Sequence, residues 1–240
     1  MLKKITDKIY CLSYERENDR PNLYYILGEK YSIAIDAGNS LRHVNLFYEE
    51  LEKNGLRKPL LTVITHWHWD HTFGIYAVEG LTIASALTNN KLREVQQWKW
   101  NLEAMAERER TGEDIEFCNQ CIQVEYENLN DITVIPADIE IEDKMKIDLG
   151  GVTCIVEHRD APHSRDSLFI YVPEEKALII GDADCEDHYE NNGIYDKNKL
   201  AEYIKYIENI NFKHYLIGHD ESELKEVALD YLKSQLENCM

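Results

Sequence analysis

Three histidines and an aspartate within six residues constrain this chain more than any other feature. They directly follow the apolar, β-branched run 60–65 and read His66-Trp67-His68-Trp69-Asp70-His71. The run predicts a strand buried on both faces. Because side chains of an extended chain alternate between two sides, His66 and His68 point the same way and can bind one ion. Asp70 and His71 lie on the turn beyond and can reach a second ion.

The ligand types favour zinc, because imidazole nitrogen and carboxylate oxygen bind it readily; iron, manganese and nickel are alternatives. The competing interpretation of the segment is a polar surface loop. Only nine histidines occur in 240 residues, so three of them in one hexapeptide are unexpected by chance. The two neighbouring tryptophans also add a dry wall that a surface loop does not need. We therefore predict a metal site here.

One hexapeptide cannot complete the coordination of two ions, and three further candidates follow predicted strands. His163 lies in the turn between the predicted strands 152–157 and 168–172. Asp182 follows the apolar run 177–180, and His219 follows the run 215–217. Each of these alone could be an ordinary loop residue. Their shared position, just past a hydrophobic strand, predicts that they join the same site.

The remaining pattern predicts strands and helices in two successive sets. We expect strands at 8–14, 22–27, 31–35, 60–65, 132–135, 139–141, 144–147, 152–157, 168–172, 177–180 and 215–218. We expect helices at 41–54, 88–112, 114–126, 200–210 and 221–236. Strands followed by helices, twice, indicate two packed sheets with helices outside. We expect one domain over residues 1–240, with a helical insertion at about 88–128.

Composition narrows the choice of partners. The chain has 45 acidic and 26 basic side chains, a net charge of −19, which opposes binding to nucleic acid or to an anionic membrane. No apolar stretch is long enough to span a bilayer, and the start of the chain lacks the apolar core of a secretory signal. The six cysteines form no disulfide pattern. We expect a cytoplasmic protein that acts on a small-molecule substrate; its oligomeric state is open.

In order and number the seven candidates resemble the ligands of the metallo-β-lactamase superfamily of metal-dependent hydrolases. That pattern is His-x-His-x-Asp-His, then a histidine, then Gly-Asp, then Gly-His. The segments 22–26 and Asp36-Ala37-Gly38 also resemble the first strands of that family. The resemblance implies an α/β fold, the four-layer αβ/βα sandwich, with both sheets inside and the ligands along one edge.

The resemblance also implies a role for each ligand. His66, His68 and His163 hold the first ion; Asp70, His71 and His219 hold the second; Asp182 bridges the two. In such a dinuclear centre a hydroxide between two divalent ions, preferably zinc but also iron or manganese, attacks the substrate. Asp70 is implied to be catalytic as well, by orienting this nucleophile.

In having an aspartate at position 182, the chain resembles the glyoxalase II-type thioesterases, the lactonases and the nuclease-like branches of the family. Class B β-lactamases generally lack an aspartate at this position. The segment 163–167 is, however, locally similar to the β-lactamase branch. We expect hydrolysis of a small ester, thioester or lactone-type bond. A β-lactam or phosphodiester hydrolase, a di-iron redox enzyme with the same ligands, and a non-catalytic metal-binding member are alternatives. The substrate and the native metal are open.

The segment 88–128 carries two further hypotheses. We expect a helical cover near the metals, with Trp98 and Trp100 available to line a pocket, although Trp98 lies on the apolar stripe and is better explained by packing. Cys118 and Cys121 form a C-x-x-C pair with no second pair at zinc-ribbon spacing. We therefore interpret both as core residues.

Overall fold

The first seven strands form one sheet in their order along the chain. In this computed structural model, which describes residues 1–239, β1 to β4 pair antiparallel and β4 to β7 pair parallel. The strands are β1 (Leu2–Lys4), β2 (Ile9–Leu12), β3 (Leu23–Leu27), β4 (Ser32–Ile35), β5 (Leu61–Val63), β6 (Leu81–Ser85) and β7 (Ile139–Ile141).

The later strands form a second, six-stranded sheet in the order β13-β12-β11-β10-β9-β8. All its pairs are antiparallel except β11 with β12. The strands are β8 (Lys144–Asp148), β9 (Thr153–Arg159), β10 (Ser167–Val172), β11 (Ala177–Gly181), β12 (His214–Ile217) and β13 (Glu223–Leu224).

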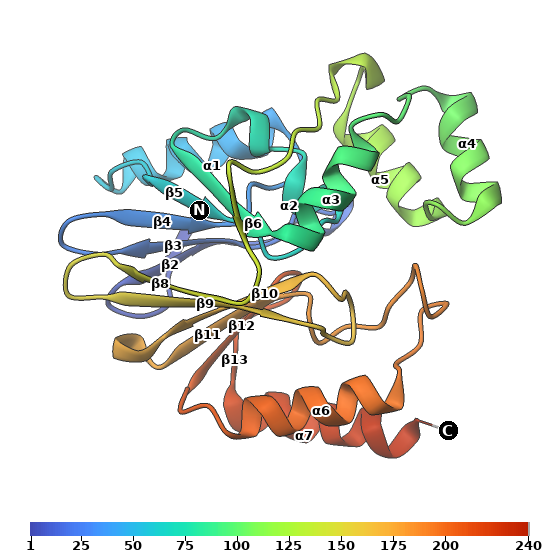
Figure 1. Cartoon of the computed structure of the whole chain (residues 1–240). Coiled ribbons are helices and arrows are strands. Elements are labelled where there is room, and N and C mark those ends of the chain that lie inside the picture. The colour runs from blue at the N-terminus through green and yellow to red at the C-terminus, as the bar shows by residue number, and fades with distance from the viewer. Residues whose placement is uncertain (240) are drawn as a thin grey trace.

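Helices cover the outer side of each sheet (Figure 1). The first sheet carries α1 (Leu41–Lys53), α2 (Trp69–Thr72) and α3 (Ala86–Val95), and α4 (Leu102–Thr111) and α5 (Glu116–Glu125) project beyond one end of it. The second sheet carries α6 (Lys197–Glu208) and α7 (Lys225–Asn238). This arrangement confirms the predicted α/β sandwich of four layers.

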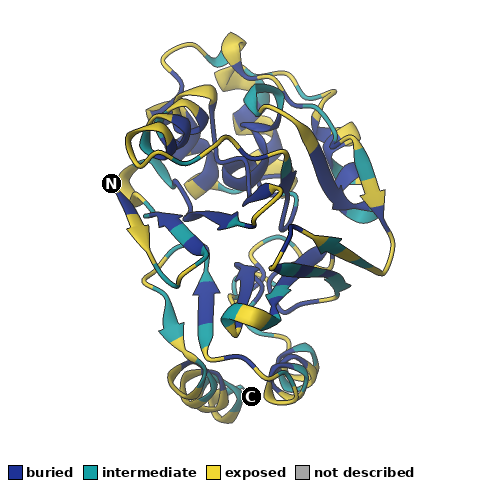
Figure 2. Cartoon of the chain, turned by 90° about the vertical axis from the view of Figure 1, so that its left-hand side faces the viewer, coloured by how far each residue is buried: buried dark blue, intermediate teal, exposed yellow. Residues whose placement is uncertain are grey.

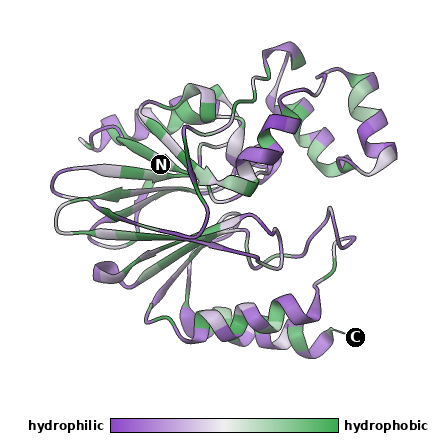
Figure 3. Ribbon diagram, viewed as in Figure 1, coloured by the Kyte–Doolittle hydropathy of each residue, from purple (hydrophilic) through white to green (hydrophobic). Residues whose placement is uncertain are grey.

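Alternation along the strands explains the layering. In β11, Ala177 and Ile179 pack between the two sheets, whereas Leu178 and Ile180 pack against α6 and α7. Successive side chains of a strand point to opposite faces, so a strand that is covered on both sides is apolar at every position. Figure 2 accordingly shows the buried residues in the interior, and Figure 3 shows apolar strands between helices that are polar on their outer faces.

Several local predictions differ from the structure. The predicted helix 88–112 is two helices, because Asn101 accepts a hydrogen bond from the backbone N–H of Ala104 and caps a new helix, α4. The segment 132–135 is no strand; Ile132 and Val134 are buried among the helices instead. The strands β1, β6 and β13 are not among the predicted ones. The predicted helix 221–236 begins only at Lys225, because Glu223 and Leu224 pair with β12 as β13.

Within residues 1–239, no helix has both the length and the apolar character needed to cross a bilayer.

Candidate metal centre

The seven predicted ligands meet at one edge of the sandwich. His66 and His68 follow β5, and α2 presents Asp70 and His71 directly after them. The other three lie in the connections that follow strands of the second sheet: His163 after β9, Asp182 after β11 and His219 after β12. Because β5 lies in the parallel part of its sheet and β11 pairs parallel with β12, their carboxyl ends provide the edge where ligands of α/β proteins commonly bind.

The first group consists of His66, His68 and His163, whose ligand atoms all lie within 4.8 Å of one another. All three are buried. His163 Nε2 lies 3.0 Å from His68 Nδ1, and the His66 and His68 ring centroids are 4.4 Å apart. The three side chains therefore converge, and His66 and His68 point to the same side of the chain, as the His-x-His spacing predicts.

The second group consists of Asp70, His71, Asp182 and His219, again within 4.8 Å of one another. Asp70 Oδ2 lies 2.9 Å from His71 Nε2 and 2.9 Å from His219 Nε2. Asp182 Oδ2 lies 3.3 Å from His71 Nε2 and 3.4 Å from His219 Nε2. The same oxygen is 3.9 Å from His163 Nε2, so the Asp182 carboxylate stands between the two groups.

Contacts behind the ligands fix the orientation of two rings. Asp36 Oδ2 lies 2.8 Å from His71 Nδ1, and the other Asp36 oxygen accepts a hydrogen bond of 2.7 Å from the Thr65 backbone N–H. The Glu186 carbonyl lies 2.7 Å from His163 Nδ1. Such contacts leave the opposite ring nitrogen free to bind a metal and raise its basicity.

Glycine is required where the chain passes close to these ligands. A Cβ at Gly218, directly before His219, would collide with the Asp182 carboxylate. At Gly181, directly before Asp182, a Cβ would collide with Thr65. The positive φ of 56° at Gly181 is a second reason why glycine is favoured there. The Gly-Asp and Gly-His pairs of the sequence are therefore steric requirements of the site.

The two groups differ electrostatically. Burial lowers the pKa of His66 and His68 well below the ordinary value, so both rings are neutral. Burial also opposes protonation of His71, but the charges of Asp70 and Asp182 raise its pKa well above the ordinary value. The second group thus holds protons on its histidines that a metal ion would displace.

The donor set fits metal ions. His66 Nε2 and Asp182 Oδ1 are buried without a hydrogen-bond partner among residues 1–239. An unpaired buried polar atom costs roughly 1–3 kcal/mol, which coordination would offset. For tetrahedral zinc, bond lengths of about 2.0–2.1 Å place neighbouring ligand atoms about 3.3 Å apart. The distances of Asp182 Oδ2 from His71 and His219, 3.3 and 3.4 Å, are close to that separation.

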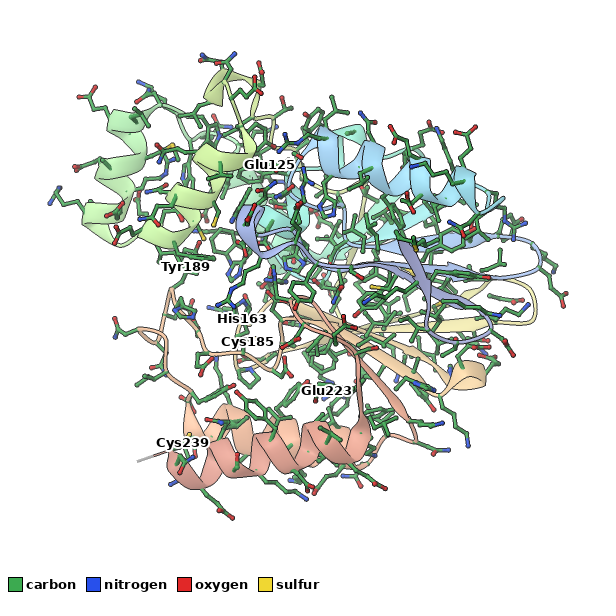
Figure 4. The ribbon with its side chains drawn as sticks, turned by 180° about the vertical axis from the view of Figure 1, so that it is seen from behind. Glu125, His163, Cys185, Tyr189, Glu223 and Cys239 are labelled. Atoms are coloured by element: carbon green, nitrogen blue, oxygen red, sulfur yellow. The ribbon has the colours of Figure 1, made fainter. Side chains whose placement is uncertain are left out.

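A cleft of about 680 Å³ opens onto this edge, and five of the seven ligands line it. Tyr189 closes one side: its ring centroid lies 4.9 Å from those of Trp67 and of His68. The Tyr189 hydroxyl donates a hydrogen bond of 3.1 Å to Asp114, just before α5. Figure 4 shows Tyr189, His163 and Cys185 together between the two halves of the sandwich.

The helical segment borders the cleft, but through residues other than the expected ones. Ile115, Phe117 and Cys118 line it. Trp98 packs among the helices, as its place on the apolar stripe predicts, and Trp100 packs there too and does not line the cleft. The Arg108 guanidinium lies 4.5 and 4.7 Å from their ring centroids. Cys118 and Cys121 are buried, as predicted.

Sequence reasoning missed two residues at the site. Asp19 Oδ1 lies 3.7 Å from His219 Nδ1, on the side of that ring away from Asp70. Its left-handed backbone, with φ of 51°, suits aspartate, but no pattern in the sequence links positions 19 and 219. Tyr189 lies seven residues after Asp182, and a lone tyrosine at that distance gives no indication that its ring contacts Trp67 and His68.

Curated relatives include thioesterases. The human acyl-coenzyme A thioesterase MBLAC2 is 27% identical over 195 residues, which are 75% of this chain and 64% of that protein. This chain thus spans less than two thirds of the length of that relative. A probable metallo-hydrolase of Methanocaldococcus jannaschii, MJ0888, is 45% identical over 58 residues, 24% of this chain and 27% of that protein.

Solved structures share the fold. A metallo-beta-lactamase from Pontibacter korlensis superposes with a TM-score of 0.70 at 17% identity, covering 100% of this chain and 99% of that one. The sec-alkylsulfatase Pisa1 from Pseudomonas gives 0.70 at 16% identity over 98% of this chain and 41% of that one. The sequence model described as the metallo-beta-lactamase superfamily matches residues 17–219. The chain therefore belongs to the metallo-beta-lactamase superfamily.

Proposed function

We propose that this protein is a dinuclear metal-dependent hydrolase of small esters, thioesters or lactones, with an acyl thioester as its first candidate substrate. The observation that carries the proposal is the convergence of seven buried or half-buried ligands into two groups that share Asp182 between them. The family agrees with a metal-dependent hydrolase, and the thioesterase name of its human relative suggests the substrate class.

We assign His66, His68 and His163 to one ion and Asp70, His71 and His219 to the other, with Asp182 shared. Divalent ions held by these residues would supply acidification of a bound water and polarisation of the bond to be cleaved. Asp36 and the Glu186 carbonyl hold His71 and His163 in the binding orientation.

The residues around the two groups of ligands shield one side of the site and leave a cleft open on another. Tyr189 and Trp67 shield the first group from water on one side, and the cleft of about 680 Å³ admits substrate from another. Asp70 lines that cleft and belongs to the second group, a position from which its carboxylate can orient the attacking water.

Metal content and a substrate panel test the proposal. Protein purified without added metal should contain two divalent ions per chain, zinc by preference, and should hydrolyse chromogenic thioesters or lactones faster than β-lactams and phosphodiesters. Two bound irons with an oxygen-dependent activity would favour a redox enzyme. Two bound metals with no hydrolysis of any substrate class would contradict catalysis.

A substitution tests the shared ligand. We expect Asp182→Ala to lose much of the metal and most of the activity, because both groups lose a carboxylate oxygen. Asp7→Ala, at a carboxylate that is 89% exposed, is the control and should keep both. Full metal content in Asp182→Ala, measured by elemental analysis, would refute the bridging role.

A further inference from the structure

We propose that the start of α5 forms the binding site for the apolar acyl group of the substrate. We call the residues Ile115, Phe117 and Cys118 the α5 wall. This inference rests on the proposed function, which supplies the reacting bond, and adds where the uncharged part of the substrate binds.

The α5 wall and the metal ligands line one continuous cleft. His68, Asp70, His163, Asp182 and His219 line the same cleft of about 680 Å³ as the α5 wall does. Small-molecule sites typically measure roughly 300–1,000 Å³ and have mostly apolar linings with a few polar groups. An acyl carbon held at the ligands would therefore carry its chain along the α5 wall without leaving the cleft.

Phe117 is not needed for the core. Its side chain is 55% exposed, whereas Cys118, Cys121 and Ile122 on the same helix are buried among the helices. A large apolar side chain that stays exposed beside a reactive site has unsatisfied contact area that a ligand can cover. Ile115 is half-buried and continues this apolar surface toward Cys118.

The charges around the cleft favour an uncharged group here. Apart from the metal ligands, the acidic residues Asp19, Glu186 and Asp220 line it, together with the basic residues Arg16 and His188, of which Arg16 carries a permanent charge. Carboxylates repel phosphate or carboxylate groups of a substrate. The acyl part of a thioester carries no charge, so it suits this surface better than an anionic thiol carrier would.

The helix α5, which carries the α5 wall at its start, is held in place at both ends. The Tyr189 hydroxyl bonds Asp114 just before the helix and lies 3.5 Å from Cys118 Sγ. At the other end the Glu125 carboxylate, which is labelled in Figure 4, binds Arg20 and Arg42; the distances are 3.0 and 2.9 Å. A wall that is already ordered loses little conformational freedom when it binds an acyl chain, so more of the free energy of burial remains as affinity.

Thioesters of increasing acyl length test the proposal on the metal-loaded protein. We expect kcat/KM to rise about fourfold per added methylene from acetyl toward octanoyl, the factor that burial of one CH2 provides. In Phe117→Ser, kcat/KM for the octanoyl thioester should fall at least about tenfold. For the acetyl thioester it should fall less than about twofold. Phe117→Leu should restore most of the preference.

Val124→Ser is the matched control, since Val124 lies on the same helix, is 58% exposed, and does not line the cleft. Its chain-length profile should equal that of the unmodified protein. A flat profile, or equal losses for both esters in Phe117→Ser, would overturn the acyl site while leaving thioester hydrolysis intact.

Binding of free octanoate to the metal-loaded protein, measured by calorimetry, separates this inference from the proposed function. Bound metal ions would offset the repulsion of the head group by the nearby carboxylates, so the comparison reports on the alkyl tail. Octanoate that binds more tightly than butyrate, and does so only with Phe117 present, would support the acyl site even if no thioester is cleaved. Equal affinity for octanoate and butyrate, or octanoate binding unchanged in Phe117→Ser, would refute it.

Discussion

Glu125 anchors α5. Removing its charge should lower the stability of the protein by an amount that follows from the structure. The Glu125 side chain is fully buried and binds the guanidinium of Arg20 at 3.0 Å and that of Arg42 at 2.9 Å. The Ser40 hydroxyl donates a further hydrogen bond to it. Burial disfavours the charge, but the hydrogen bonds from Arg42, Ser40 and Arg20 lower the pKa of Glu125 below its usual value. The carboxylate is therefore ionised at neutral pH.

Replacing Glu125 by glutamine keeps the shape and removes the charge. The Arg20 side chain is only 8% exposed, so it would lose its buried counter-charge and keep only Glu15, at 2.8 Å. Breaking a buried pair costs about 3–5 kcal/mol. Because Glu15 remains and the glutamine oxygen can still accept a hydrogen bond, we expect the lower end, about 3 kcal/mol. For a chain of this size, that lowers the melting temperature by about 6–12 °C.

Urea and thermal denaturation of metal-free protein measure this loss. Glu15→Gln is the matched control, because it neutralises the other carboxylate that binds Arg20. The Glu15 side chain is 50% exposed, so this substitution should lower the free energy of unfolding by less than about 1 kcal/mol. A loss below about 1 kcal/mol in Glu125→Gln, or equal losses in both variants, would show that Glu125 does not anchor α5 by charge.

Two other substitutions test the contact behind His71 and the pH dependence of stability. Asp36→Asn, which tolerates the positive φ of 64° at this position, weakens the contact with His71 Nδ1, and we expect metal affinity to fall about 10–100-fold in competition with a chelator. Unchanged affinity would show that this contact does not prepare the ligand. Burial, with the charge of Arg20 adding to it, lowers the pKa of His43 to about 3. The unfolded chain then binds a proton below about pH 6.5 that the folded chain does not, so stability falls as the pH falls from 6.5 toward 3. At about 1.4 kcal/mol per pH unit, His43 accounts for about 2 kcal/mol between pH 6.5 and 5, and His43→Gln should lose that much less stability over this range in urea denaturation. Identical pH dependence of the two proteins would contradict it.

Local pattern predicted most of the strands and all seven candidate ligands. His66 and His68 were found because their shared direction follows from the geometry of an extended chain, which depends on neighbouring residues alone. Asp182 and His219 were found because a polar residue after an apolar run marks the end of a buried strand. The break between α3 and α4 was missed because the apolar stripe continues across it, whereas the cap at Asn101 decides where the new helix begins.

Only the tertiary structure decided which residues from distant parts of the chain meet. The contact of Asp36 with His71, the position of Asp19 beside His219 and the exposure of Phe117 toward the cleft all depend on how the sheets and the helical segment pack. Packing angles and loop paths arise from the sum of many weak contacts across the whole core, so no short stretch of sequence encodes them. The proposed type of chemistry therefore follows from ligands that local sequence patterns identify. The proposed selectivity for the acyl group depends on how the surrounding elements pack.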